Sequence, residues 1–303
     1  MSSTTVRVPA KINLALGVGA VGSDGLHALA TVYQAVDLCD EVRASVRDDA
    51  EVTVTVHRDG DGERDDVPLD GTNLAVRAAL ALREATGVTD GVSLAIRKVI
   101  PVAGGMAGGS ADAAATLVAC DELWGTGLGR AGLEPIAATL GSDVPFCLHG
   151  GTAVGGGHGE QISPVLARGS YQWVFAIAER GLSTAAVYGE FDAITDGVVT
   201  EPVVPDQLMS ALRAGDAEAL GQALSNDLQP AALRLRPELE ETLAVGRQCG
   251  ALGALLSGSG PTAMFLAGDD QHAMDIAVAL AAARVCVDVV QAAGPVSGAR
   301  VVG

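Results

Sequence analysis

The segment that most constrains the fold of this 303-residue chain is a glycine-rich run between a predicted strand and a predicted helix. The residues SLAIRKVI alternate as a strand does, Gly104, Gly105, Gly108 and Gly109 follow, and an alanine-rich helix is expected over 111–124. Glycine lets backbone N–H groups converge without obstruction by Cβ, and a helix N-terminus adds partial positive charge. This order of elements suits an anion such as a nucleotide phosphate. A glycine-rich connection that only packs closely is the competing interpretation.

Two common nucleotide-binding motifs do not account for this run. It is not a Walker A loop, because no Gly-Lys-Ser or Gly-Lys-Thr ends it. Upstream, Gly17, Gly19 and Gly22 match the G-x-G-x-x-G dinucleotide fingerprint. Residues 23–25 are Ser-Asp-Gly, which oppose a helix where that fingerprint requires one. We therefore set aside a Rossmann site and, with it, a NAD-dependent oxidoreductase.

Two charged residues are candidates for catalysis. Lys11 lies between Ala10 and Ile12 at the head of an apolar predicted strand, where a lysine is unusual. Its ordinary role would be to extend its ammonium group to solvent. Asp143, in LGSDVPF, follows a Gly-Ser turn and precedes a run predicted as a strand. It would either cap the turn or serve as a general base for a hydroxyl nucleophile.

A second glycine turn, LLSGSGPT, joins two apolar predicted strands through residues 257–260. It is either a simple hairpin turn or a second set of backbone donors for phosphate. Two separate anion sites in one chain would suit phosphoryl transfer onto a substrate that already carries phosphate.

Composition excludes several classes of protein. With 19 basic and 37 acidic residues, the chain carries a net charge of −18, which disfavours binding to nucleic acid or to an anionic membrane. No apolar run approaches the roughly 20 residues of a membrane span, and the N-terminus lacks the pattern of a signal peptide. The five cysteines form no C-x-x-C pair and the five histidines show no metal-ligand spacing. We expect a cytoplasmic protein with no metal site built from side chains alone.

The pattern of strands and helices predicts an α+β chain of two domains, residues 1–163 and 164–303, divided near the glycine-rich stretch 155–164. Strands are expected at 6–8 and 12–18, and the apolar run VPFCLHGGTAV is predicted to be another. The acidic stretch 58–71 is predicted to be an exposed loop. Three helices are expected between 195 and 248.

Taken in order, these motifs resemble those of the GHMP family of small-molecule kinases. The resemblance is carried by PAKINLAL at 9–16, DGLHAL at 24–29, IPVAGGMAGGSADAA at 100–114, LGSDVPF at 140–146 and LSGSGPT at 256–262. It spans nearly the whole chain and is strongest to the branch that acts on a cytidine-diphosphate-linked methylerythritol. The resemblance implies an N-terminal domain like domain 2 of ribosomal protein S5, containing the phosphate loop, and a ferredoxin-like C-terminal domain.

The resemblance also implies a reaction and its catalytic residues. ATP with Mg²⁺ would donate its γ-phosphoryl group to the 2-hydroxyl of the methylerythritol moiety, in the non-mevalonate pathway to isoprenoids. Asp143 would accept the hydroxyl proton, and Lys11 would polarise the hydroxyl and keep Asp143 ionised. Partners are then a small-molecule substrate, no nucleic acid and no membrane, in a monomer or weak homodimer.

Binding residues follow from the same resemblance. The expected phosphate loop consists of Pro101, Val102, Ala103, Gly104, Gly105, Met106, Ala107, Gly108, Gly109, Ser110 and Ala111. Asn73 and Lys98 are expected near the adenosine, and the Ser110 hydroxyl is the one side-chain candidate for contact with Mg²⁺. The residues expected to contact the cytidyl substrate are Asn13, His27, Thr184, Tyr188, Gly258 and Ser259, with His27 at the cytosine edge.

The chain departs from the family pattern at three positions. Leu26 replaces an aromatic residue that stacks on cytosine in many members, and Ala107 and Ala111 replace the commoner Gly and Ser. The lost stack predicts weaker substrate affinity with activity retained. Two alternatives stay open at this point: a GHMP kinase for another alcohol, such as homoserine or a sugar, and a non-catalytic sensor on the same fold.

Overall fold

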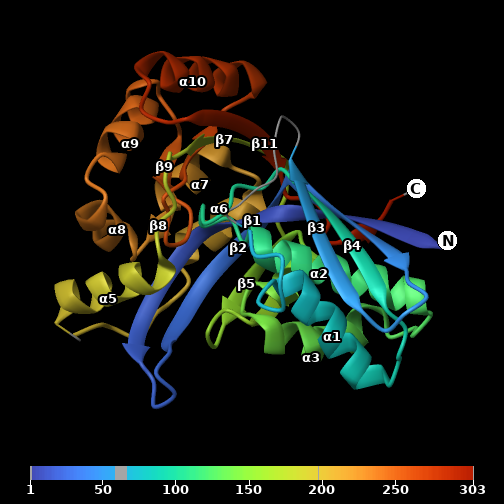
Figure 1. Ribbon diagram of the computed structural model, residues 1–303. Helices are drawn as coiled ribbons and strands as arrows, with labels where there is room; N and C mark the ends of the chain where they lie inside the picture. The colour runs from blue at the N-terminus through green and yellow to red at the C-terminus, as the bar shows by residue number, and fades with distance from the viewer. Residues whose placement is uncertain (1, 59–66, 197, 303) are drawn as a thin grey trace.

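The computed structural model describes residues 2–58, 67–196 and 198–302. Within these ranges, the chain forms a mixed eight-stranded sheet and an antiparallel four-stranded sheet, each covered by helices (Figure 1). Two apolar cores follow from this arrangement: one lies mainly between the first sheet and helices α1 to α4, and the other packs the second sheet on its helices.

A long hairpin organises the first sheet. Strand β1 (Ser3–Val21) pairs antiparallel with β2 (His27–Val46) over most of their lengths. We expected two short strands in place of β1. The register shifts at Pro9/Ala10 and Asn13/Ala15 explain the difference, because these irregularities absorb residues that break the alternation and let the strand continue.

The strand order of the first sheet is β12-β1-β2-β4-β3, with β5 paired to β2 and β6, and with β8 paired to β1. The further strands are β3 (Val52–Arg58), β4 (Val92–Lys98), β5 (Thr152–Gly156), β6 (Gln161–Pro164), β8 (Ser225–Asn226) and β12 (Arg300–Val301). The helices beside this sheet are α1 (Leu74–Thr86), α2 (Gly108–Trp124), α3 (Gly129–Leu140) and α4 (Val144–His149). Because β12 pairs with β1, the end of the chain returns to the strand where it began.

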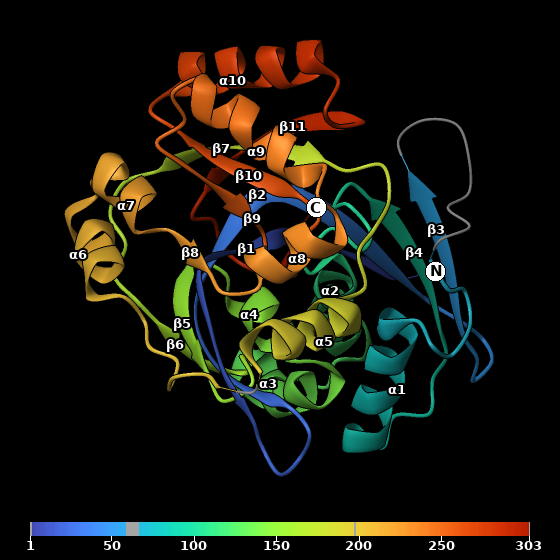
Figure 2. The same cartoon turned by 90° about the vertical axis from the view of Figure 1, so that its left-hand side faces the viewer.

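The second sheet has the order β11-β7-β10-β9, which is 4-1-3-2 in chain order. This is the ferredoxin-like arrangement that we predicted. Its strands are β7 (Tyr171–Ile177), β9 (Gly253–Leu256), β10 (Ala263–Ala267) and β11 (Asp288–Gly294). The helices of this part are α5 (Thr184–Thr195), α6 (Asp206–Ala214), α7 (Ala217–Ala223), α8 (Gln229–Leu235), α9 (Leu239–Gln248) and α10 (Asp270–Ala283). Figure 2 shows α9 and α10 beside this sheet, which they contact through β7, β9 and β10.

Two further predictions of secondary structure were wrong. The run after Asp143 was expected to be a strand, but it forms helix α4 before β5 begins at Thr152. Its residues 144–148 are all buried, and a short apolar run buried on every side carries no periodicity to separate helix from strand. Four helices lie between 195 and 248 where three were expected. Most of the predicted acidic loop lies outside the described residues, and the division into 1–163 and 164–303 stays a prediction.

Helix α2 lies at the centre of the first core, in contact with β1, β2, α1, α3 and α4. Its small side chains explain how one helix can approach so many elements: Ala111, Ala113, Ala114 and Ala115 are completely buried. Close packing on all sides fixes the position of its N-terminus, where the glycine-rich loop ends.

A buried hydrogen bond links the two sheets. The indole Nε1 of Trp173 on β7 donates to Oε1 of Gln34 on β2 at 2.9 Å, and both residues are fully buried. The Gln34 amide also donates to Oγ1 of Thr152 at 3.2 Å. A polar pair in an apolar junction is stabilising only while both partners are present.

We therefore predict that Gln34→Leu lowers the free energy of unfolding by about 2 kcal/mol, because the buried Trp173 N–H loses its acceptor. Urea denaturation of the variant, of Trp173→Phe and of the double variant measures this. The double variant should lose less than the sum of the two single losses, and strict additivity would show that the two side chains do not interact.

Candidate active site

A cavity of about 1200 Å³ lies where β1, β2, the glycine-rich loop, the start of α4, helix α5 and the 257–260 turn meet. Most of the residues predicted for catalysis and binding line it. Those that do are Lys11, Asn13, His27, Pro101, Ala103, Gly104, Gly105, Ala107, Gly108, Gly109, Ser110, Asp143, Thr184, Tyr188, Gly258 and Ser259. Segments far apart in the sequence therefore converge on a single space.

Lys11 and Asp143 form an ion pair in the wall of this cavity. The Lys11 Nζ lies 3.2 Å from Oδ2 of Asp143 and donates to Oδ1 of Asn13 at 3.1 Å. Asn13 is held in turn by Thr31, whose hydroxyl accepts from the Asn13 amide at 2.8 Å. Lys11 is buried, whereas 27% of the Asp143 side chain is exposed, so the carboxylate is the partner that a ligand can reach.

Tyr33, which the sequence did not indicate, completes this group. The Lys11 ammonium lies 5.0 Å from the centre of the Tyr33 ring, within the range of a cation–π contact. Burial raises the pKa of Tyr33 well above its usual value, and the Asp143 carboxylate raises it further. The phenol therefore stays neutral beside the ion pair.

The glycine-rich loop is attached to both sides of the cavity. The backbone N–H of Lys11 donates to the carbonyl of Met106 at 3.1 Å. On the other side, the Ser257 hydroxyl donates to the carbonyl of Gly105 at 3.0 Å. A Cβ at Gly105, where φ is +77°, would lie 2.1 Å from the carbonyl oxygen of Ser257. Glycine at this position is therefore required for the two glycine turns to pack together.

The loop ends at the exposed N-terminus of α2. Ala107, the residue before the helix, has a left-handed conformation with φ of 58° and provides no side-chain cap. Gly108, Gly109 and Ser110, whose N–H groups are the first of the helix, line the cavity. These N–H groups lack intrahelical partners and face a cavity, which is an arrangement that fits phosphate.

The opposite end of the cavity is formed by the β1–β2 hairpin and α5. The His27 ring lies 5.0 Å from that of Tyr188, and its Nδ1 is 2.8 Å from the carbonyl oxygen of Gly19. Thr184 at the start of α5 shares a hydroxyl hydrogen bond of 3.0 Å with Ser259.

The β1–β2 hairpin contains Gly17, Gly19 and Gly22, the pattern that we rejected as a dinucleotide site. Gly19 is explained by packing, because a Cβ there would lie 2.7 Å from Pro202.

Asn73 and Lys98 line a smaller cavity of about 260 Å³ on the other side of the loop. Asn73 caps α1, and its amide donates to the carbonyl of Pro68 at 2.7 Å. Of the remaining loop residues, Val102 lines this smaller cavity, whereas Met106 and Ala111 are completely buried and line neither.

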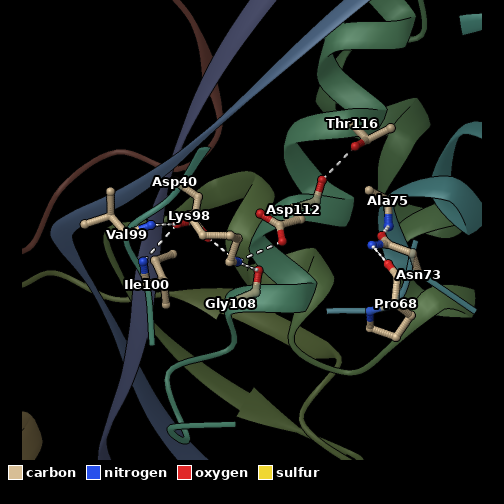
Figure 3. A network of polar contacts seen from close by, with 10 residues as sticks. All are labelled: Asp40, Pro68, Asn73, Ala75, Lys98, Val99, Ile100, Gly108, Asp112 and Thr116. Atoms are coloured by element: carbon tan, nitrogen blue, oxygen red, sulfur yellow. Dashed lines mark hydrogen bonds and ion pairs between the residues drawn. The ribbon is translucent and has the colours of Figure 1, made fainter. Parts of the chain in front are cut away.

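Lys98 is held by a buried network that sequence reasoning did not anticipate (Figure 3). Its ammonium group pairs with Asp40, with Asp112 at 2.8 Å and with the carbonyl of Gly108 at 3.2 Å. The other oxygen of Asp40 accepts from the N–H groups of Val99 and Ile100 at 2.6 and 2.8 Å. The network thus ties the end of β4 to the first turn of α2, and so fixes both ends of the loop.

Burial of the Asp112 carboxyl raises its pKa to about 8, and Asp40 adds to the shift while Lys98 opposes it. Asp112 therefore keeps its proton in the folded chain at pH values where the unfolded chain releases it. The protonated Asp112 carboxyl therefore adds to the free energy of unfolding at low pH, and this stabilisation is lost as the pH rises through about 8.

We predict that Asp112→Asn, which cannot ionise, shows a smaller decrease in the free energy of unfolding between pH 5 and pH 8 than the parent chain. Denaturant titrations at several pH values measure, for each protein, the slope of the free energy of unfolding against pH. Glu122→Gln, which removes the same charge from the exposed side of α2, is the control and should keep the parent slope. Equal slopes in the parent and Asp112→Asn would contradict the protonated state.

Over the described residues, no group of three or more His, Cys, Asp or Glu side chains could hold a metal ion. Ser110, at the open end of α2, is the hydroxyl nearest in sequence to the exposed amides. This fits a magnesium ion carried mainly by phosphate oxygens and water, which is its usual mode in phosphoryl-transfer sites. In the same part of the chain, no helix is long and apolar enough to span a membrane.

Two family models and several named proteins match this chain. The model of the GHMP kinases N terminal domain matches residues 73–151, and that of the GHMP kinases C terminal domain matches 208–285. A 4-diphosphocytidyl-2-C-methyl-D-erythritol kinase of Thermobifida fusca is 54% identical over 99% of each chain. The kinase of the same name from Streptomyces coelicolor is 55% identical, again over 99% of each chain.

Solved structures agree with this relationship. A crystal structure of 4-(cytidine 5'-diphospho)-2C-methyl-D-erythritol kinase has a TM-score of 0.76 and 32% identity, covering 95% of this chain and 98% of that one. A mevalonate kinase of L. major has a TM-score of 0.75 over 98% and 97% of the two chains, but with 16% identity it shows the fold alone. The family uses ATP as its phosphate donor on small-molecule substrates. The chain belongs to the GHMP kinase family.

Proposed function

We propose that this kinase transfers the γ-phosphoryl group of ATP to the 2-hydroxyl of 4-diphosphocytidyl-2-C-methyl-D-erythritol, in the non-mevalonate route to isoprenoid precursors. The observation that carries the proposal is the Lys11–Asp143 ion pair of 3.2 Å, in the same cavity as the open N-terminus of α2. The names of relatives that are 54% and 55% identical over almost the whole chain support this acceptor.

Asp143 orients the acceptor hydroxyl and takes its proton. The hydroxyl oxygen forms a bond to the γ-phosphorus as the bond from that phosphorus to the β–γ bridging oxygen breaks, and ADP leaves. Lys11 holds the carboxylate ionised and offsets the negative charge of the transferred group. Phosphoryl transfer depends mainly on such positioning and electrostatic stabilisation.

The loop 101–111 and the first amides of α2 hold the phosphates, with Asn73 and Lys98 beside the adenosine. The Ser110 hydroxyl is the candidate protein contact of a Mg²⁺ ion, which would offset the charge of the phosphate oxygens. Because Lys98 is already paired with two aspartates, its contribution is to hold the loop in place.

The acceptor occupies the other end of the cavity. His27 and Tyr188 bind the cytosine, Asn13 lies beside the methylerythritol, and Gly258 and Ser259 face the diphosphate. Leu26 lines this end and is 53% exposed, so it offers an aliphatic surface in place of an aromatic face. Tyr188 is then the aromatic ring of this group that stacks on the base.

We predict that Asp143→Asn and Lys11→Ala each lower kcat by about 10²- to 10⁴-fold, because one removes the base and the other its electrostatic partner. Coupled detection of ADP measures turnover, and calorimetry should show ATP binding within a few-fold of the parent chain. Asp206→Asn on α6 is the matched control and should leave both quantities unchanged.

The acceptor itself is tested by ADP formation with the cytidyl substrate, homoserine and a panel of sugars. We expect ADP release that depends on the cytidyl substrate. ADP release with homoserine or a sugar, and none with the cytidyl substrate, would contradict the proposed acceptor. Turnover that survives in Asp143→Asn would contradict the proposed base.

A further inference from the structure

The turn between β5 and β6 lines the large cavity next to the β1–β2 hairpin. It covers residues 157–160 and falls in the glycine-rich stretch where the sequence predicts a domain boundary. His158 and Glu160 of this turn are in the cavity wall. Neither side chain has a part in the proposed reaction, so their place beside it calls for another explanation.

Glycines bring this turn against Tyr33. A Cβ at Gly155 would lie 2.6 Å from Cε2 of Tyr33, and a Cβ at Gly159, where φ is +104°, would lie 2.4 Å from its hydroxyl oxygen. The Tyr33 ring is in turn in contact with the Lys11 ammonium. Close packing on a buried ring fixes the turn relative to the Lys11–Asp143 ion pair.

His158 links this fixed turn to the hairpin tip, which we define as residues 22–27. Its Nδ1 lies 2.9 Å from the carbonyl oxygen of His27, and its Nε2 lies 2.9 Å from Oδ2 of Asp24. The backbone adds a contact just beyond the tip, since the N–H of Leu29 donates to the carbonyl of Gly157 at 2.8 Å. One imidazole therefore holds the tip at two points.

Both partners of the His158 ring accept hydrogen bonds, because a carbonyl oxygen and an ionised carboxylate have no proton to donate. Asp24 is ionised, since the N–H of Leu26 donates to its Oδ1 at 3.0 Å and lowers the pKa of the carboxyl. An imidazole that donates from both nitrogens is the protonated, cationic ring. The carbonyl of His27 raises the pKa of His158. Within the described residues, the carboxylates of Asp24 and Glu160 face the ring and raise this pKa further.

We propose that His158 is a positioning residue for the acceptor: its cationic ring holds the hairpin tip in place at the cavity wall. The proposal rests on the proposed cytidyl acceptor, since His27 at the end of the tip is expected to contact it. His158 acts through the backbone of His27 and through Asp24. Because the link needs the protonated ring, it is present below the pKa of His158 and is lost as the pH rises through that value, which lies above the usual 6.5.

Steady-state kinetics at about pH 6.5, where the ring is protonated, test the positioning role. We expect His158→Gln to raise the KM of the cytidyl substrate about tenfold, because an uncharged amide replaces a cation that is hydrogen-bonded to a carboxylate. The values of kcat and of the KM for ATP should stay within about twofold, since the ion pair and the glycine-rich loop are not touched.

The matched control is His149→Gln, because His149 pairs with Glu134 and does not line the cavity. It should keep all three kinetic values. An unchanged KM of the cytidyl substrate in His158→Gln would overturn the proposal. Parallel changes in kcat and in both KM values would also overturn it, since they are the result of a general loss of structure.

The pH profile separates a protonated link from simple packing. From about pH 6 to about pH 9, the KM of the cytidyl substrate should rise in the parent chain, and His158→Gln should lose most of this rise. Asp24→Asn keeps the Oδ1 that accepts from Leu26 and presents an amide donor to Nε2, which suits the neutral ring. Its KM should therefore fall as the pH rises. The same slope in all three proteins would contradict the cationic link.

A titration of the His158 ring by NMR, without any substrate, tests the link apart from the proposed function. The signal that is missing from His158→Gln assigns the ring. Its pKa should be lower in Asp24→Asn than in the parent chain, and equal values would overturn the link. If the parent chain has no activity on the cytidyl substrate, the proposed function fails. The Kd of CDP in the same proteins and pH range then decides the role of His158.

Discussion

The position of the glycine-rich loop, the proposed phosphate site, depends on its packing between β1 and the 257–260 turn. The carbonyl of Met106 accepts from the backbone of Lys11, and the carbonyl of Gly105 accepts from Ser257. The same strand that supplies the Lys11 side chain therefore anchors the loop through its backbone. Asp143 contacts the Lys11 side chain, so a movement of the loop relative to β1 would change the distance between the proposed base and a phosphate held by the loop.

The proposed reaction requires an acidic protein to bind an anionic donor and an anionic acceptor. The chain has a net charge of −18 and only two lysines, Lys11 and Lys98, and both flank the phosphate loop. Each is paired with aspartate, so neither presents an uncompensated charge. The positive potential that phosphate requires then comes largely from backbone amides at the N-terminus of α2. Burial raises the pKa of Asp112, which favours a neutral carboxyl in the Lys98 network beneath the loop.

The sequence was most informative where backbone geometry demands a particular residue. The strand, glycine loop and helix were predicted and confirmed, and the ferredoxin-like order of the second sheet followed from the family resemblance. The strand expected after Asp143 was wrong because residues 144–148 are buried on every side and show no period. Tyr33, Asp40 and Asp112 were missed, since each gains its position from a partner distant in sequence. The roles of Lys11 and Asp143 remain a proposal that rests on their contact.

The most direct test of the proposed active site is a crystal structure of the chain with a non-hydrolysable ATP analogue and 4-diphosphocytidyl-2-C-methyl-D-erythritol bound together. We expect the γ-phosphate on the first amides of α2 and the acceptor 2-hydroxyl about 2.6–3.2 Å from the Asp143 carboxylate. A complex in which the phosphates avoid the 101–111 loop, or in which the hydroxyl points away from Asp143, would contradict the assignment of the site.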